Sequence, residues 1–135
     1  MGFTQRVNAV PTDAWNNPSP CPGWTARDVV RHMVEWAVVR DAILAALADP
    51  AVAAFEFDSA AGKMNVEQSI GMIVTGDVLI HSWDLARAAG LDETLDPEEV
   101  HRMFEGAQPF DEILRSSGQF GLGSSCPTQL TNKPS

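Results

Sequence analysis

The chain has 135 residues, of which 44% are hydrophobic and 20% are charged, and this composition excludes a chain that is disordered throughout. Its length favours a single domain with a core large enough to fold without disulfides. The 18 acidic residues against 9 basic residues give a net charge of −9, so nucleic acid and anionic membrane surfaces are not expected as partners.

The first 48 residues predict a short helix, a stiff connector and a long helix. Residues 3–10 have the apolar spacing of a short helix that stops before a proline. Residues 16–23 contain three prolines, which remove backbone donors and favour extended conformations, so this segment is expected to be irregular. Thr25 and Asp28 then form a capping pair that predicts a helix over residues 26–48.

The middle of the chain predicts a loop and a second long helix. Residues 49–63 mix alanine, alternating phenylalanines and a glycine, so we expect a loop with a short extended piece at 54–57. An apolar run over residues 65–89 begins at a cap-like asparagine and ends before Gly90, which is a natural residue to end a helix.

The last part of the chain predicts a third long helix and a tail. Asp96, followed by a proline and two acids, is a strong start signal for a helix over residues 97–117, with a bend near Pro109. Residues 121–135 show no periodicity and are expected to form a mobile tail. The expected organisation is therefore one helical domain over residues 1–120 followed by this tail.

Polar residues lie on the apolar faces of the two longest predicted helices. At about 100° per residue, Asp77, His81 and Asp84 fall within an arc of roughly 60° that also carries isoleucine, valine and leucine side chains. His32, in the earlier helix, shares its face with apolar side chains in the same way. Because an unpaired carboxylate in a core costs several kcal/mol, these acids should be paired, hydrogen-bonded or bound to a metal ion.

Face-to-face packing of the two helices would bring His32, Asp77 and His81 together as two nitrogens and one oxygen. Three protein ligands with an open fourth position are typical of a catalytic zinc ion, and bundle cores build such sites from facing helices. We therefore predict a divalent metal site, with Zn²⁺ as the first candidate ion and Ni²⁺ or Fe²⁺ as alternatives.

Each of these residues also has a purely structural interpretation. His32 could be a hydrogen-bonded core residue, and Asp77 with His81 could be a buried ion pair one helical turn apart. Asp84 could pair with Arg87, or it could accept a hydrogen bond that orients His81. We favour both of these roles for Asp84 over direct ligation of a metal.

The remaining histidine and the tryptophans are not assigned to the site. His101 lies among charged residues at a helix start and is expected to face solvent. Four tryptophans are assigned to packing of the core and the connector: Trp15, Trp24, Trp36 and Trp83.

Two strings in the sequence resemble a known family. The first is PSPCPGWT at residues 18–25 with DVVRH at residues 28–32, and the second is DVLIHSWDLAR at residues 77–87. Together they resemble the metal-binding domain of mycothiol-dependent maleylpyruvate isomerase, within the DinB-like superfamily. The resemblance extends from about residue 3 to about residue 120.

The resemblance implies an all-α, DinB-like up-down four-helix bundle that holds one divalent metal ion near its open end. It implies His32, Asp77 and His81 as the metal ligands, in agreement with the helical faces described above. Related proteins use the metal to bind and activate a low-molecular-weight thiol, typically mycothiol, for transfer to or isomerisation of an electrophilic substrate. The expected function is therefore that of a metal-dependent thiol transferase or isomerase.

The chain also departs from this family. The first helix and the C-terminal region look shortened, which would leave the metal site intact but remove part of a substrate pocket. A metal-binding helical module without catalysis, or a helical interaction protein, is therefore the alternative expectation. A missing helix would expose an apolar patch, which a homodimer could cover.

The apolar stretches and the cysteines bear on where in the cell the protein is expected. Asp77 and His81 interrupt the longest apolar stretch, so no membrane span is expected, and the first residues lack a secretory hydrophobic region. Cys21 and Cys126 are too few for a disulfide framework and are expected to be reduced thiols. A cytoplasmic protein is the resulting expectation.

Overall fold

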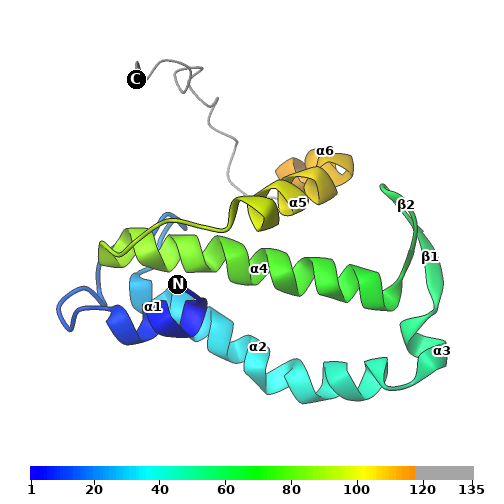
Figure 1. Ribbon diagram of the computed structural model, residues 1–135, viewed down its shortest axis with the longest axis horizontal. Coiled ribbons are helices and arrows are strands. Elements are labelled where there is room, and N and C mark those ends of the chain that lie inside the picture. Colours follow the sequence, from blue (N-terminus) through cyan, green and yellow to red (C-terminus); the bar gives the residue numbers. More distant parts are fainter. Residues whose placement is uncertain (118–135) are drawn as a thin grey trace.

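Two long helices dominate the computed structural model, which describes residues 1–117, with the side chains of residues 37 and 38 left aside. The elements in chain order are α1 (Phe3–Ala9), α2 (Ala26–Leu47), α3 (Pro50–Ala53), β1 (Glu56–Ser59), β2 (Gly62–Asn65), α4 (Val66–Ala89), α5 (Pro97–Ala107), a 3₁₀ turn (Gln108–Phe110) and α6 (Asp111–Ser116). Helices α2 and α4 lie side by side in opposite directions, and α1 and α5 both pack against α4 (Figure 1). The predicted all-α fold is confirmed.

Local capping signals set the ends of the two long helices. The Thr25 side chain accepts a hydrogen bond from the Asp28 backbone N–H, and the Asp28 carboxylate accepts one from the Thr25 N–H. Asn65 and Gln68 make the same reciprocal pair at the start of α4. Helix α4 ends at Gly90, whose φ of 68° lies in the left-handed region that glycine adopts freely. Both predicted helices are confirmed to within one residue.

The segment between the long helices is more ordered than predicted. Residues 49–63 were expected to be a loop, but they contain helix α3, strand β1 and the start of β2. Asp49 caps α3 by accepting from the Ala51 N–H, and β1 pairs antiparallel with β2. The extended piece lies at Glu56–Ser59 rather than at 54–57. Four-residue strands carry too short an alternation to be located from sequence alone.

The predictions for the two ends of the described chain are also borne out. Residues 3–9 form α1. The helix predicted for residues 97–117 divides into α5, a 3₁₀ turn and α6 around Pro109, which has no N–H to continue the helical ladder. The predicted tail at 121–135 and Cys126 lie outside the described residues.

The core occupies the end of the molecule at which α1, the start of α2 and the end of α4 meet (Figure 1). Val29 and Leu85 are fully buried there, and the buried residues of α4 all lie between Ser82 and Ala89. The other halves of α2 and α4 expose large apolar side chains such as Leu44. No helix within residues 1–117 is long and apolar enough to cross a membrane.

A buried arginine ties the loop after α4 to the N-terminal helix. Arg6 is 2% exposed, and its guanidinium donates hydrogen bonds to the backbone carbonyls of Met1, Asp92 and Thr94. These carbonyls satisfy a buried charge that would otherwise be costly. The contact holds the chain against α1 just beyond the end of α4, and so helps to fix the half of α4 that carries His81.

Candidate metal centre

Three side chains from facing helices converge at the border between the core and the open half of the molecule. His32 comes from α2, and Asp77 and His81 come from successive turns of α4. The Nε2 atom of His32 lies 3.1 Å from Asp77 Oδ2, and the Nε2 atom of His81 lies 3.6 Å from Asp77 Oδ1. One potential ligand atom from each of the three residues lies within 4.8 Å of the other two. The structure thus brings together the three residues that the sequence analysis singled out.

The group is half-buried, with one side open. The His81 side chain is 12% exposed, whereas His32 and Asp77 are about a third exposed, at 31% and 27%. With His81 largely buried and the other two side chains partly exposed, a small molecule can approach the site from solvent. That is the arrangement expected where a small molecule must reach the bound group.

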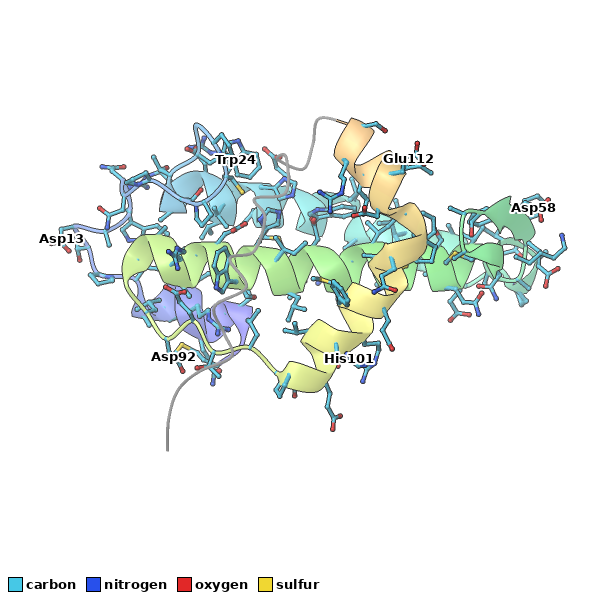
Figure 2. All side chains as sticks on the ribbon, turned by 90° about the horizontal axis from the view of Figure 1, so that it is seen from above. Asp13, Trp24, Asp58, Asp92, His101 and Glu112 are labelled. Atoms are coloured by element: carbon cyan, nitrogen blue, oxygen red, sulfur yellow. The ribbon has the colours of Figure 1, made fainter. Side chains whose placement is uncertain are left out.

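Trp24 covers the two histidine rings. Its ring centroid lies 5.2 Å from that of His32 and 6.1 Å from that of His81, with the second pair stacked. The connector holds Trp24 by two backbone hydrogen bonds, from the Trp24 N–H to the Cys21 carbonyl and from the Ser19 N–H to the Trp24 carbonyl. Figure 2 shows Trp24 beside the first turns of α2. Trp24 was expected only to pack in the core and the connector, and its contact with the site was not predicted.

Asp84 contacts His81 on the side away from Asp77. Asp84 is 3% exposed, and its Oδ2 lies 3.0 Å from His81 Nδ1. An ionised carboxylate only accepts hydrogen bonds, so Nδ1–H donates, and Nε2 is left to face Asp77. The alternative partner, Arg87, pairs instead with Glu93 at 3.2 Å and lies over the Trp83 ring. Of the two partners considered for Asp84, the structure places His81 beside its carboxylate and not Arg87.

A thiol lies next to this group, and the sequence analysis did not place it there. The Cys21 thiol donates to Asp84 Oδ2 at 3.2 Å, and Cys21, His81 and Asp84 form a second set of potential ligand atoms within 4.8 Å. Burial, together with the hydrogen bond to the negatively charged Asp84, raises the pKa of Cys21 to about 11. The thiol is therefore protonated at neutral pH. The signal in the sequence was its position three residues before Trp24 in the same rigid connector.

The donor set suits a divalent cation. Two imidazole nitrogens and one carboxylate are ligands that Zn²⁺, Ni²⁺ and Fe²⁺ all accept. Because His81 donates through Nδ1, its Nε2 presents a lone pair to the carboxylate of Asp77 unless a proton or a metal ion lies between them. A cation between the two groups would bind both the His81 nitrogen and the Asp77 carboxylate, and the nearby Nε2 of His32 could bind it too. The residues present therefore fit a metal ion.

His101, which was predicted to lie outside the site, makes none of the contacts described above. It sits on α5 and pairs with Glu105, and both side chains are exposed. It joins neither group of potential metal ligands within residues 1–117.

Comparison with known proteins points to one family. The family model of the mycothiol maleylpyruvate isomerase N-terminal domain matches residues 2–101. Two uncharacterized proteins of Mycobacterium tuberculosis, one from strain CDC 1551 / Oshkosh and one from strain ATCC 25618 / H37Rv, are each 33% identical over 153 aligned residues. These alignments cover 94% of this chain and 84% of each relative. No solved structure matches the chain at a significant level.

Proposed function

This chain belongs to the mycothiol maleylpyruvate isomerase N-terminal domain family, and on that premise we propose that it is a divalent-metal-binding protein that acts in thiol transfer or isomerisation. The observation that carries the proposal is the convergence of His32, Asp77 and His81, each with one potential ligand atom within 4.8 Å of the others. The family match covers all three residues. The proposed metal is Zn²⁺, with Ni²⁺ and Fe²⁺ as alternatives.

Each residue of the site has a distinct task in this proposal. His32, Asp77 and His81 would hold the ion, and Asp84 fixes the orientation and the tautomer of His81. Trp24 shields the histidine rings from water on one side. When bound, the ion would favour the thiolate form of a thiol, which is the nucleophilic form.

The proposed co-substrate is a low-molecular-weight thiol of the mycothiol type, and the proposed partner of that thiol is an electrophilic small molecule. Support comes from the family and from the partly exposed side of the site, through which a small molecule can reach the ligands. The Cys21 thiol, with its raised pKa, is poorly suited to be the nucleophile itself. In this proposal the protein works in the cytoplasm, where low-molecular-weight thiols are kept reduced.

A second candidate function is that of a helical module without a metal ion. The observation that favours it is that Asp77 lies within ion-pair distance of both histidines and Asp84 pairs with His81. A protonated His81 between two carboxylates would satisfy this network without a metal. In that case the polar cluster would specify the packing of α2 against α4 and nothing more.

Cobalt substitution tests the proposed thiol chemistry. Apoprotein loaded with Co²⁺ should show visible absorption bands, and adding mycothiol should add a sulfur-to-cobalt charge-transfer band that saturates at about one thiol per ion. The His101→Ala variant is the matched control and should behave as the wild type does. The thiol-transfer proposal fails if Co²⁺ binds but neither mycothiol, glutathione nor cysteine changes the spectrum.

A further inference from the structure

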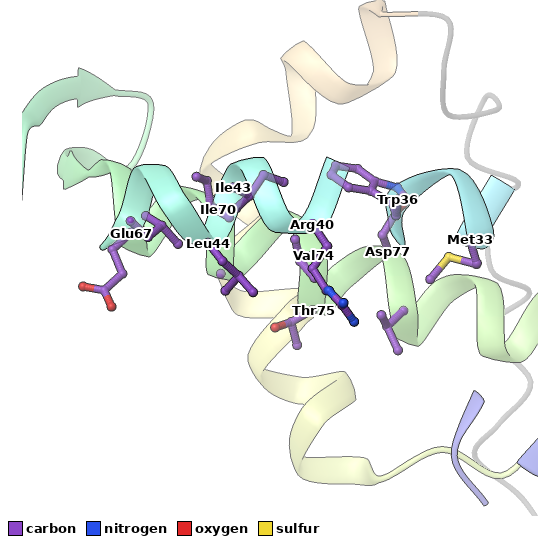
Figure 3. A pocket seen from close by; sticks show the side chains of 13 residues that line it. Met33, Trp36, Arg40, Ile43, Leu44, Glu67, Ile70, Val74, Thr75 and Asp77 are labelled. Carbon is purple, nitrogen blue, oxygen red and sulfur yellow. The ribbon is translucent and has the colours of Figure 1, made fainter. Parts of the chain in front are cut away.

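A groove runs between α2 and α4 on the open half of the molecule, away from the core. Its volume is about 450 Å³, which is within the usual range for sites that bind small molecules. Figure 3 shows side chains from both helices lining it, most of them apolar. The apolar residues that line its floor and walls include Trp36, Ile43, Leu44, Ile70 and Val74.

The groove begins at the candidate metal centre. Asp77 lines one end of it, and Trp36 lies one helical turn beyond His32 on α2. At 1.5 Å per residue, Arg40 lies roughly 12 Å along α2 from His32. A molecule lying in the groove would therefore have one end at the metal centre and the rest of its length along the two helices.

The apolar surface of the groove is not covered by other described residues. Leu44 is 57% exposed and Val74 is 37% exposed, although both face the space between the helices (Figure 3). Large apolar side chains in this position gain free energy when an apolar molecule displaces water from them. The groove therefore suits a ligand with an apolar body.

One cation lies within this apolar lining. Arg40 comes from α2 and, among the described residues, it pairs with its chain neighbour Asp41 in a contact in which both side chains are largely exposed. An exposed pair between neighbours is weak, so the guanidinium remains able to bind a carboxylate through two N–H groups. The two ends of the groove carry Asp77 and Glu67, which repel an anion. An anionic group is therefore favoured at Arg40 and disfavoured at either end.

We propose that this groove binds a small amphipathic anion, an alkyl or aryl carboxylate whose apolar body lies along α2 and α4 and whose carboxylate pairs with Arg40. The binding itself is independent of the metal. The inference concerns binding in the groove alone and stands apart from the proposed thiol chemistry.

The test uses full-length protein and three eight-carbon probes: octanoate, octan-1-ol and octylammonium. Isothermal titration calorimetry should show one octanoate per chain, with octylammonium the weakest of the three. Arg40→Gln should weaken octanoate about fivefold and leave octan-1-ol unchanged, because it removes the positive charge and leaves a polar side chain at the same place. Leu44→Ser should weaken octanoate and octan-1-ol alike. Arg102→Gln, which removes an exposed arginine on α5, is the control and should bind as the wild type does.

The same titrations on metal-free protein and on His81→Ala separate this inference from the proposed function. Octanoate binding that persists in both supports the groove. If, in addition, no form of the protein binds a metal ion, the proposed function fails and the groove inference stands. Metal binding with no octanoate binding overturns the groove and leaves the proposed function standing. Equal affinity for octanoate and octylammonium, or no effect of Arg40→Gln, also overturns it.

A second copy of the chain is the competing occupant. Sedimentation velocity should therefore show that Leu44→Ser and the wild type have the same mass, both with and without octanoate. A wild-type dimer that Leu44→Ser dissociates would overturn the small-molecule assignment and give this face to the homodimer.

Discussion

At the scale of single residues, the carboxylate of Asp84 links His81 to Cys21. It is buried and accepts hydrogen bonds from both His81 Nδ1 and the Cys21 thiol. If the Asp84 carboxylate is replaced by a neutral group, the His81 ring is free to rotate and to change its tautomer. The side chains that face the ion would remain, so the effect should fall on affinity rather than on the existence of the site.

Asp84→Asn should therefore lower the affinity for Zn²⁺ by about tenfold or more, whereas Asp77→Ala should abolish tight binding. Competition with a chromophoric chelator measures both affinities. Arg87→Gln is the control, because Arg87 pairs with Glu93 and not with Asp84. An Asp84→Asn protein that is folded by circular dichroism and binds Zn²⁺ as the wild type does would refute the orienting role.

The Cys21 thiol should react slowly with alkylating reagents near neutral pH. Its pKa is raised from 9.0 to about 11, so at pH 8 the thiolate fraction falls about hundredfold relative to an ordinary cysteine. Alkylation by iodoacetamide in the metal-free Cys126→Ser variant should be correspondingly slow and should rise with pH up to about 11. Adding Asp84→Asn should speed it at pH 8, because a negative partner is lost. A rate equal to that of a small-molecule thiol would contradict this environment for Cys21.

At the scale of elements, the start of α2 depends on a cap that is sensitive to acid. The backbone N–H and the hydroxyl of Thr25 donate to the Asp28 carboxylate, and these bonds hold the pKa of Asp28 below its usual value. A carboxyl with a depressed pKa in the folded state stabilises the fold above its unfolded value of about 3.8, and this contribution is lost as the pH falls through the depressed pKa.

Asp28→Asn should therefore flatten the decline in the free energy of unfolding on the acid side. Urea denaturation between pH 3 and pH 6 measures this slope. Asp41→Asn, also on α2 but without a capping bond, should keep the slope of the wild type. If Asp28→Asn and the wild type lost stability in parallel down to pH 3, the cap would not be a source of acid sensitivity.

The same local character explains what could be predicted from the sequence. The caps at Thr25 and Asn65 lie within three residues of the groups they bond, so the ends of α2 and α4 were accessible from sequence. The faces of His32 and His81 followed from helical periodicity. The hairpin at β1 and β2 was missed because short strands carry little periodic signal. The contacts of Cys21 and Trp24 depend on how an irregular connector folds back over two helices, which no local pattern records.

At the scale of the whole molecule, packing is concentrated at one end. Leu85 is fully buried against the start of α2, whereas Leu44 on the open half is largely exposed. The core thus supports the candidate metal centre from one side, and the groove leaves the other side free. Shortening an apolar side chain should therefore cost much more stability in the core than in the open half of the molecule.

Leu85→Ala should destabilise the protein by about 2–5 kcal/mol, because it leaves a cavity in a closed core. Leu44→Ala should cost less than about 1 kcal/mol, since more than half of that side chain is already in contact with water. Urea denaturation of both variants at neutral pH gives the two values. Equal losses of stability would mean that the open half is covered in solution, as it would be in a homodimer.

The candidate metal centre gives the most direct test, because His32, Asp77 and His81 are proposed to hold one divalent metal ion. Elemental analysis of untagged protein, purified without chelator, tests it most directly, beside the variants His32→Ala, His81→Ala and His101→Ala. We expect about one equivalent of metal in the wild type and in His101→Ala, and a loss of metal in the other two. A folded wild-type protein that carries no metal and takes up none from zinc, nickel or iron salts would contradict this expectation.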